Sequence, residues 1–167
     1  MTSLLPDIDP DGLLEYSVVF TDRSLNHMSQ AFQQVMREIS STLQEVYSAS
    51  AVVVVPGGGT YGMESIVRQF AIGKECLVIR NGFFSFRWSQ IIEMGGLTNE
   101  VTVIKARQKV AGTQAPFSPP PLEEVLDAIR AKKPEVVFAP HVDTSSGMML
   151  PEDYITAVSE AVHEHGG

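Results

Sequence analysis

The strongest constraint on the fold is the repeated alternation of short apolar runs with stretches of helical periodicity. Residues 51–55 and 136–139 are apolar throughout and rich in Val. Such runs are typical of strands in a parallel sheet that helices cover on both sides. Two further strands are predicted at residues 76–79 and 101–104. A chain with this pattern must build a layered structure around a central sheet.

Helical patterns separate the predicted strands. Apolar residues at steps of three and four predict an amphipathic helix with one buried stripe over residues 26–48. Another helix is predicted after each apolar run, and the last extends from Pro151 to His165. We therefore predict an α/β fold, with an open, mainly parallel sheet, helices on both faces and right-handed crossovers. Residues 1–25 are expected to form an irregular N-terminal lead-in, and residues 26–167 the folded part.

Composition excludes several classes of protein. The chain has 167 residues, 44% apolar and 19% charged, which indicates one globular domain rather than a disordered chain. Its net charge of −8 gives no general attraction for nucleic acid or anionic lipid. No apolar run reaches the ~18 residues of a membrane span, and no signal peptide is visible. The single Cys76 favours a reducing compartment, so we expect a cytoplasmic protein.

The glycine-rich segment 57–62 joins a predicted strand to a predicted helix. Backbone N–H groups at a helix N-terminus bind anions, and glycine lets an anion approach closely. Thr60 adds a hydroxyl donor, so phosphate is the natural ligand. The alternative is a tight turn without a ligand. A Walker P-loop is excluded because no Lys follows the glycines in the required position.

The same segment also satisfies the pattern G-x-G-x-x-G of dinucleotide-binding folds. That pattern expects an acidic residue about 20 positions further on, where it binds the ribose. Arg80 and Asn81 occupy that place here, and Arg80 suits a 2′-phosphate. An NADP-dependent oxidoreductase with a Rossmann-like glycine loop is therefore an alternative interpretation.

Two further loops follow predicted strands, at residues 81–88 and 141–147. Because the carboxyl ends of parallel strands meet at one edge of a sheet, loops from neighbouring strands converge there. An aromatic ring at this edge can stack on a flat cofactor, and Phe84 is the candidate. The other aromatic side chains of the first loop are expected to pack in the core or in an interface: Phe83, Phe86 and Trp88.

The second loop contains the residue types of a hydrolase triad, namely His141, Asp143 and either Ser145 or Ser146. Neither serine lies in the G-x-S-x-G pattern of a nucleophile elbow. We therefore interpret this segment as a polar loop rather than as a triad.

Taken together, these loops resemble class V aminotransferases. This family comprises pyridoxal-phosphate-dependent enzymes of fold type I, of the serine/alanine–glyoxylate or 2-aminoethylphosphonate–pyruvate type. The residues that carry the resemblance are Gly58-Gly59-Thr60 with Met63-Glu64, Asn81-Gly82-Phe83-Phe84, and residues 141–147 with Pro151. The resemblance covers roughly residues 20 to 167. It implies that residues 26–167 are the N-terminal part of the pyridoxal-phosphate-binding large domain.

The resemblance also implies a site. Gly58, Gly59 and Thr60 would bind the phosphate of pyridoxal 5′-phosphate, Phe84 would stack on its pyridine ring, and Thr144 would hydrogen-bond its phenolic oxygen. The parent protein would be a transaminase that transfers an amino group from a small amino acid or amine to a 2-oxo acid. The family further implies a homodimer, and no metal.

No catalytic residue is predicted within the chain. The resemblance places the Schiff-base lysine, the acidic partner of the pyridinium nitrogen and the small C-terminal domain beyond residue 167. The lysines present are expected to be solvated surface charges: Lys74, Lys105, Lys109, Lys132 and Lys133. The chain alone is therefore predicted to be inactive. A non-catalytic half-domain that only binds a partner is a second alternative.

Overall fold

The computed structural model describes residues 27–167. The predicted lead-in at residues 1–25 lies outside the described residues. The chain divides into two compact units, Met1–Val54 and Val55–Gly167.

The described part of the first unit consists of helix α1, Gln30–Tyr47, and the segment that follows it. The Ser29 hydroxyl accepts a hydrogen bond from the Phe32 amide at 3.1 Å and caps the helix. The helix ends at Ser48, whose φ of 48° is left-handed. This confirms the helix predicted over residues 26–48. The predicted burial of its apolar stripe is wrong for the described residues, because no side chain of α1 is fully buried.

The second unit is built on a three-stranded parallel sheet. Its strands are β1, Cys76–Arg80, β2, Val101–Lys105, and β5, Val136–Phe138. The order is β2–β1–β5, so β1 is central, and Val78 lies opposite Val103 on one side and Phe138 on the other. Three of the four predicted strands are thereby confirmed.

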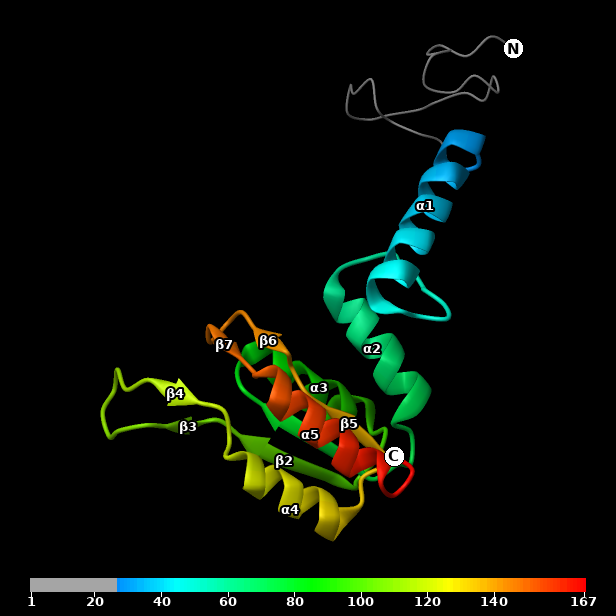
Figure 1. The fold of residues 1–167 in the computed structure, drawn as a ribbon. Helices are drawn as coiled ribbons and strands as arrows, with labels where there is room; N and C mark the ends of the chain where they lie inside the picture. The colour runs from blue at the N-terminus through cyan, green and yellow to red at the C-terminus, as the bar shows by residue number, and fades with distance from the viewer. Residues whose placement is uncertain (1–26) are drawn as a thin grey trace. The chain divides into compact units, whose positions relative to one another are not determined.

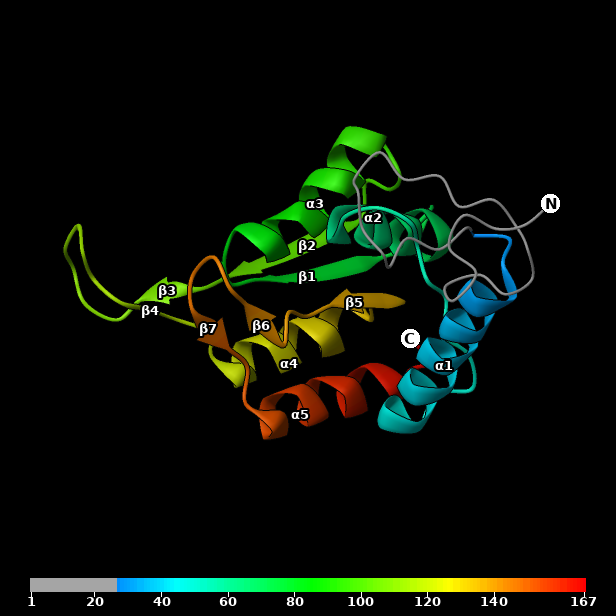
Figure 2. The same cartoon turned by 90° about the horizontal axis from the view of Figure 1, so that it is seen from above.

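Four helices cover the two faces of this sheet (Figures 1 and 2). Their bounds are Gly59–Phe70 for α2, Phe83–Gly95 for α3, Leu122–Lys132 for α4 and Glu152–His163 for α5. Helices α2 and α3 lie on one face, and α4 and α5 lie on the other (Figure 2). The predicted α/β architecture is confirmed. None of the helices in the described residues is long and apolar enough to cross a membrane.

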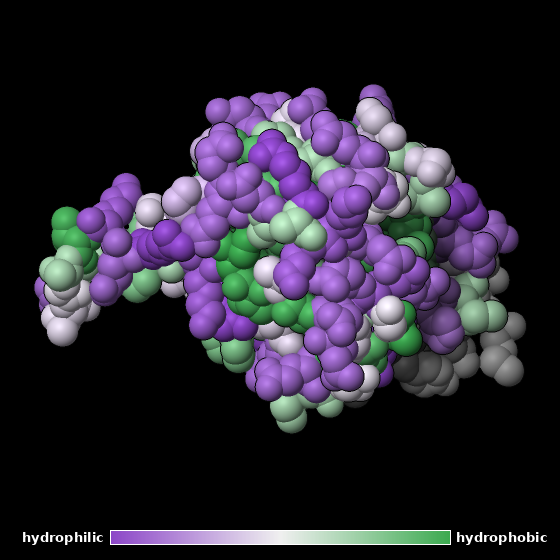
Figure 3. Space-filling view, turned by 90° about the horizontal axis from the view of Figure 1, so that it is seen from below, coloured by the Kyte–Doolittle hydropathy of each residue, from purple (hydrophilic) through white to green (hydrophobic). Residues whose placement is uncertain are grey.

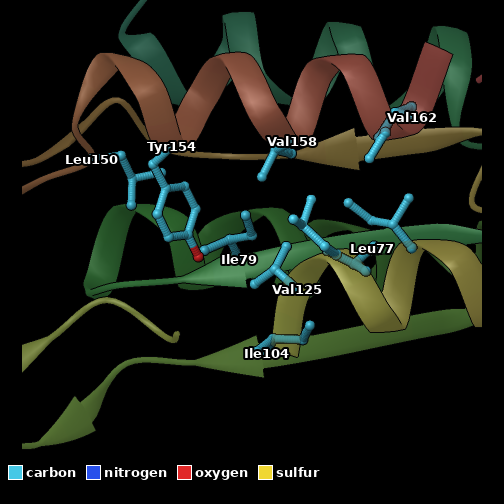
Figure 4. Close-up of a cluster of buried hydrophobic side chains, with 11 residues drawn as sticks. Leu77, Ile79, Ile104, Val125, Leu150, Tyr154, Val158 and Val162 are labelled. Atoms are coloured by element: carbon cyan, nitrogen blue, oxygen red, sulfur yellow. The ribbon is translucent and has the colours of Figure 1, made fainter. Parts of the chain in front are cut away.

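The side chains of β1 alternate between two apolar clusters. Leu77 and Ile79 point toward α4 and α5, where Val158 and Val162 pack over them (Figure 4). Cys76 and Val78 belong to the cluster on the other face, with residues of α2 and α3. Both sides of the strand are therefore sealed, as its continuous apolar sequence predicts.

Two short hairpins extend from the carboxyl ends of the strands. The first pairs β3, Arg107–Gln108, with β4, Phe117–Ser118, and reaches away from the sheet (Figure 1). The second pairs β6, Val142–Asp143, with β7, Met148–Met149. The sequence predicted only loops in both places, because two-residue strands have too few positions to show an alternating pattern.

The predicted strand at residues 51–55 is not formed. This segment has no regular secondary structure, and Val53 is 83% exposed. A strand needs the backbone of a neighbour as well as apolar side chains, and no strand pairs with this segment among the described residues. The apolar run is therefore the clearest departure from the sequence prediction.

Part of the surface of the second unit is apolar. A groove of about 290 Å³ runs along β5 and α5, and is lined mainly by Val136, Val137, Ile155, Val158 and Val162. Within the described residues, β5 pairs only with β1, so its other edge is open. Figure 3 shows that hydrophilic residues dominate the face seen from below and that apolar residues lie between them.

The exposure of residues 51–55 is testable by charge insertion. Val53→Lys should change the free energy of unfolding by less than about 0.5 kcal/mol, because the side chain is already solvated. The matched control is Val78→Lys in β1, at a position with 0% exposure, which should cost more than about 4 kcal/mol or prevent folding. Urea unfolding of both variants measures the difference. A large loss in Val53→Lys would show that the segment is buried after all.

Candidate functional site

The glycine segment forms the N-terminus of α2. Gly58 is the N-cap residue, no side chain caps the helix, and its first turn contains no acidic residue. Gly58, Gly59 and Thr60 are all exposed. Gly57 has a φ of 128°, and a Cβ there would lie 2.5 Å from the Tyr61 ring, so only glycine fits. The first-turn amides therefore present partial positive charge to solvent without a competing carboxylate.

The loop after β1 is organised by the hydroxyl of Ser85. Its oxygen accepts hydrogen bonds from the amides of Asn81 and Gly82, at 2.8 and 3.0 Å. These bonds fix the sharp turn from β1 into α3. The Asn81 side chain is only 4% exposed, and neither its amide nitrogen nor its amide oxygen has a hydrogen-bond partner among the described residues. The turn thus keeps hydrogen-bonding capacity that the described part of the chain does not use.

Asp143, at the end of β6, connects this turn to the loop after β5. Its side chain is completely buried. One carboxylate oxygen, Oδ2, accepts from the amide and the hydroxyl of Ser85, at 2.9 and 2.6 Å. The other, Oδ1, accepts from the Ser145 hydroxyl at 2.6 Å. A Cβ at Gly82 would lie 2.5 Å from Oδ1, so the close approach of the two loops requires glycine at this position.

Phe84 and Thr144 are the two predicted site residues that the structure places on adjacent segments. The amide of Phe83 donates to the Ser145 hydroxyl at 2.6 Å, and the amide of Ser85 donates to Asp143. Phe84 therefore lies between two residues that are bonded to the two neighbours of Thr144. Both site residues are exposed, Phe84 by 47%.

The glycine segment is not joined to these two loops in the same way. None of the hydrogen bonds in the described residues connects Gly58, Gly59 or Thr60 to Phe84 or Thr144. The assignment of all five residues to one site stays a prediction. Helix α2 packs against α3 through its second half, where the buried Val67 lies, and its first turn stays free.

The aromatic residues of α3 divide between core and surface. Trp88 stacks on Phe138 with the ring centroids 4.7 Å apart, as expected for a packed residue. Phe83 does not pack in the core, because its ring is 52% exposed, and packing in an interface stays a prediction. It lies in the first turn of α3, where the Arg87 guanidinium stands 4.8 Å from its centroid. Helical spacing alone does not show which turns of a helix are packed against other elements.

The residues of the rejected hydrolase triad do not form one. The carboxylate of Asp143 bonds to Ser85 and Ser145, and none of the described hydrogen bonds involves the exposed His141 side chain. The lysines are exposed as predicted, and Lys74 forms an ion pair with Glu135 at 2.5 Å.

Sequence reasoning did not find the joint role of Asp143 and Ser85. These residues are 58 positions apart, and no short sequence motif contains both of them. The available signal was that both follow predicted strands, at the edge where loops converge.

The ionisation of Asp143 follows from its surroundings. Burial alone would raise the pKa of this carboxyl group, but hydrogen bonds from Ser145, Ser85 and backbone amides outweigh that effect and lower the pKa below its ordinary value. The group is therefore a carboxylate at neutral pH, and an ionised carboxylate is purely an acceptor, which suits the donors around it.

Several of the known proteins that are similar to this chain are aminotransferases. No family model matches the chain. The alanine–glyoxylate aminotransferase of Rattus norvegicus is 28% identical over 134 residues, which are 78% of this chain and 30% of the relative. The solved structure of a ureidoglycine–glyoxylate aminotransferase from Bacillus subtilis superimposes with a TM-score of 0.65 at 20% identity, and covers 86% of this chain and 34% of that one. A protein named as the small subunit of a soluble hydrogenase, from Synechococcus sp. (strain PCC 6716), is 27% identical over 144 residues, 85% of this chain and 35% of its own length.

These findings confirm the resemblance predicted from the loops. The chain has the fold of part of a glyoxylate aminotransferase, and its sequence is similar to such enzymes. It spans about a third of the length of the relatives that it matches.

The close approach at Gly82 is testable by adding one methyl group. Gly82→Ala should lower the free energy of unfolding by about 1–3 kcal/mol, because its Cβ would force the buried Asp143 carboxylate to move. Gly62→Ala is the matched control within α2, where nothing lies within 4 Å of the added carbon, and it should stabilise the protein by about 0.5–1 kcal/mol. Equal effects of the two substitutions in urea unfolding would contradict the arrangement.

The lowered pKa of Asp143 predicts a specific response to acid. The ionised carboxylate stabilises the fold above the unfolded-state pKa of about 3.9, and this contribution is lost as the pH falls through the lower folded-state pKa. The free energy of unfolding, measured in urea between pH 2 and 6, should therefore fall less steeply in Asp143→Asn than in the unaltered chain. Ser146→Ala, which leaves the carboxylate in place, should keep the original slope. Identical slopes in all three proteins would be the contrary result.

Proposed function

We propose that this chain is the N-terminal part of the pyridoxal-phosphate-binding domain of a class V aminotransferase. The observation that carries the proposal is the fold similarity to a glyoxylate aminotransferase over 86% of the chain. The similarity in sequence to the rat enzyme extends over 78% of the chain and supports the same assignment. Both relatives are about three times longer than the matched segment, so the activity of the whole protein is part of the proposal.

The first turn of α2 fits the phosphate group. Amides of Gly59 and Thr60 lie at an uncapped helix N-terminus, and no acidic side chain in the first turn opposes an anion. No neighbouring atom lies within 4 Å of a Cβ built at Gly58 or Gly59, which leaves open space for phosphate oxygens. The Thr60 hydroxyl would donate a further hydrogen bond.

The two loops joined by Asp143 fit the aromatic ring. Phe84 presents a half-exposed ring that can stack on a flat heterocycle. The Thr144 hydroxyl would hydrogen-bond the phenolic oxygen, and the side chains of its two neighbours, Asp143 and Ser145, are hydrogen-bonded to the first turn of α3. These side chains bind and orient the cofactor, whereas the lysine that bonds to it is expected beyond residue 167.

The bound cofactor would supply an electron sink for amino-group transfer. The names of two relatives contain glyoxylate, a 2-oxo acid. We accordingly propose a small amino acid or amine as donor and a 2-oxo acid such as glyoxylate as acceptor. A homodimer and a cytoplasmic location stay predictions from the sequence.

The open edge of β5 supports the proposed place of residues 26–167 within a larger domain. The apolar groove beside this edge is lined by β5 and α5 and ends at Gly167. A parallel sheet is normally buried to its edges by further strands or helices.

The single cysteine of the chain is a packing residue. Cys76 is buried in the core, and burial, followed by the charges of Glu75 and Glu135, raises the pKa of its thiol to about 11. It is a packed, inert residue.

The proposal is tested by binding of 4′-deoxypyridoxine 5′-phosphate, which has the ring and phosphate of the cofactor but no aldehyde to react with the exposed lysines. Isothermal titration calorimetry should show saturable binding of this analogue to the unaltered chain. Phe84→Ala and Thr144→Ala should each weaken binding by about 2- to 13-fold, the loss of one stacking or hydrogen-bonding contact. Thr60→Ala should weaken the binding of inorganic phosphate as well.

The chain offers matched controls for these variants. Phe117→Ala, at an equally exposed ring in β4, and Thr156→Ala, at an exposed hydroxyl in α5, should bind as the unaltered chain does. Saturable binding of NADPH with no binding of the pyridoxine analogue would instead favour the oxidoreductase. Amino-group transfer by this chain alone would contradict the prediction that it lacks the reactive lysine.

A further inference from the structure

The hydrogen bonds around Asp143 form a closed connection between two loops that are far apart in sequence. Phe84 is flanked by Phe83 and Ser85, and both flanking amides are held by the segment that contains Thr144. Thr144 is flanked by Asp143 and Ser145, which are the residues that accept those two bonds. Phe84 and Thr144, the two proposed contacts of the ring, therefore have exposed side chains, and the residues on both sides of each are hydrogen-bonded.

We propose that Asp143 is a positioning residue that sets the spacing between Phe84 and Thr144, and thereby the alignment of the cofactor ring. The alignment of the cofactor ring rests on the proposed function. The hydrogen-bonded connection between the two loops does not depend on it. Asp143 does not touch the ring in this arrangement. It acts through the backbone that carries the two residues that do.

A carboxylate is the group that the geometry requires. Three donors converge on it: the amide and hydroxyl of Ser85 on Oδ2 and the hydroxyl of Ser145 on Oδ1. The Ser145 oxygen can then accept from the Phe83 amide, because its own proton is directed at Asp143. The amides of Phe83 and Ser85 belong to the first turn of α3, whose partial positive charge favours an anion. Removing the carboxylate therefore takes away the acceptor of the Ser85 amide and the group that orients the Ser145 hydroxyl, which holds the Phe83 amide.

Asparagine would restore part of this connection. Its amide oxygen can accept from Ser85, but its NH₂ group would be directed at Ser145 and would reverse one hydrogen bond. The structure thus predicts a graded series in which Asp143→Asn lies between the unaltered chain and Asp143→Ala. A cavity effect alone would not produce that order, because aspartate and asparagine have nearly the same size.

The connection itself is tested by amide hydrogen exchange of the full chain, measured by NMR. The amides of Phe83 and Ser85 should exchange about tenfold faster or more in Asp143→Ala, and by an intermediate factor in Asp143→Asn. Amides of α4 and α5 serve as the internal reference for any loss of global stability, and the amides of Phe83 and Ser85 should be accelerated by a larger factor than these. Asp153→Ala is the matched control: it removes the acceptor of the Tyr154 amide in the first turn of α5 and should leave the exchange rates of Phe83 and Ser85 unchanged. Equal acceleration of Phe83, Ser85 and the amides of α4 and α5 in Asp143→Ala would indicate only a general loss of stability and overturn the positioning role.

Ring alignment is tested by comparing two ligands. Asp143→Ala should weaken the binding of 4′-deoxypyridoxine 5′-phosphate by about tenfold, the loss of roughly one or two contacts. It should change the affinity for inorganic phosphate by less than about twofold, because phosphate is proposed to bind at α2. Failure of the unaltered chain to bind the pyridoxine analogue overturns the proposed function and the alignment with it. Equal binding of the analogue by the unaltered chain and Asp143→Ala overturns the alignment alone.

Discussion

Burial of β1 on both faces is the constraint on which the second unit depends. Cys76, Leu77, Val78 and Ile79 have no exposed surface. A strand without a solvent face needs neighbouring backbones at both edges and apolar cover above and below. Strands β2 and β5 supply the backbones, and the helix pairs α2–α3 and α4–α5 supply the cover. Because the three strands are parallel, their carboxyl ends lie at one edge, and the loops that follow them are brought together there.

The hydrogen bonds of Asp143 hold the two loops at that edge together. A buried carboxylate is costly unless hydrogen bonds compensate for the lost water, and Ser85 and Ser145 provide them. Gly82 allows the two loops to approach closely enough for these bonds to form. The result is a hydrogen-bonded backbone that carries two exposed side chains, Phe84 and Thr144.

Apolar runs predicted strands correctly only where the chain also supplied partners. Residues 76–79, 101–104 and 136–139 form the sheet, whereas residues 51–55, with the most regular apolar sequence, form no strand. The pattern of a sequence reports a tendency to be buried, and it does not report which backbone will complete the hydrogen bonds. The same limit applies to Phe83, whose helical spacing matches that of core residues but whose position in the first turn of α3 leaves it uncovered.

The sequence by itself determined the alternation of strands and helices and the chemical character of three loops. Glycines before a helix, an aromatic residue after one strand and a polar cluster after another follow directly from residue order. Only the tertiary structure decided that the carboxylate of Asp143 meets Ser85, which is 58 positions away. Contacts of that separation depend on strand order and on the register of the sheet, and both are fixed by packing of the whole unit rather than by any local pattern.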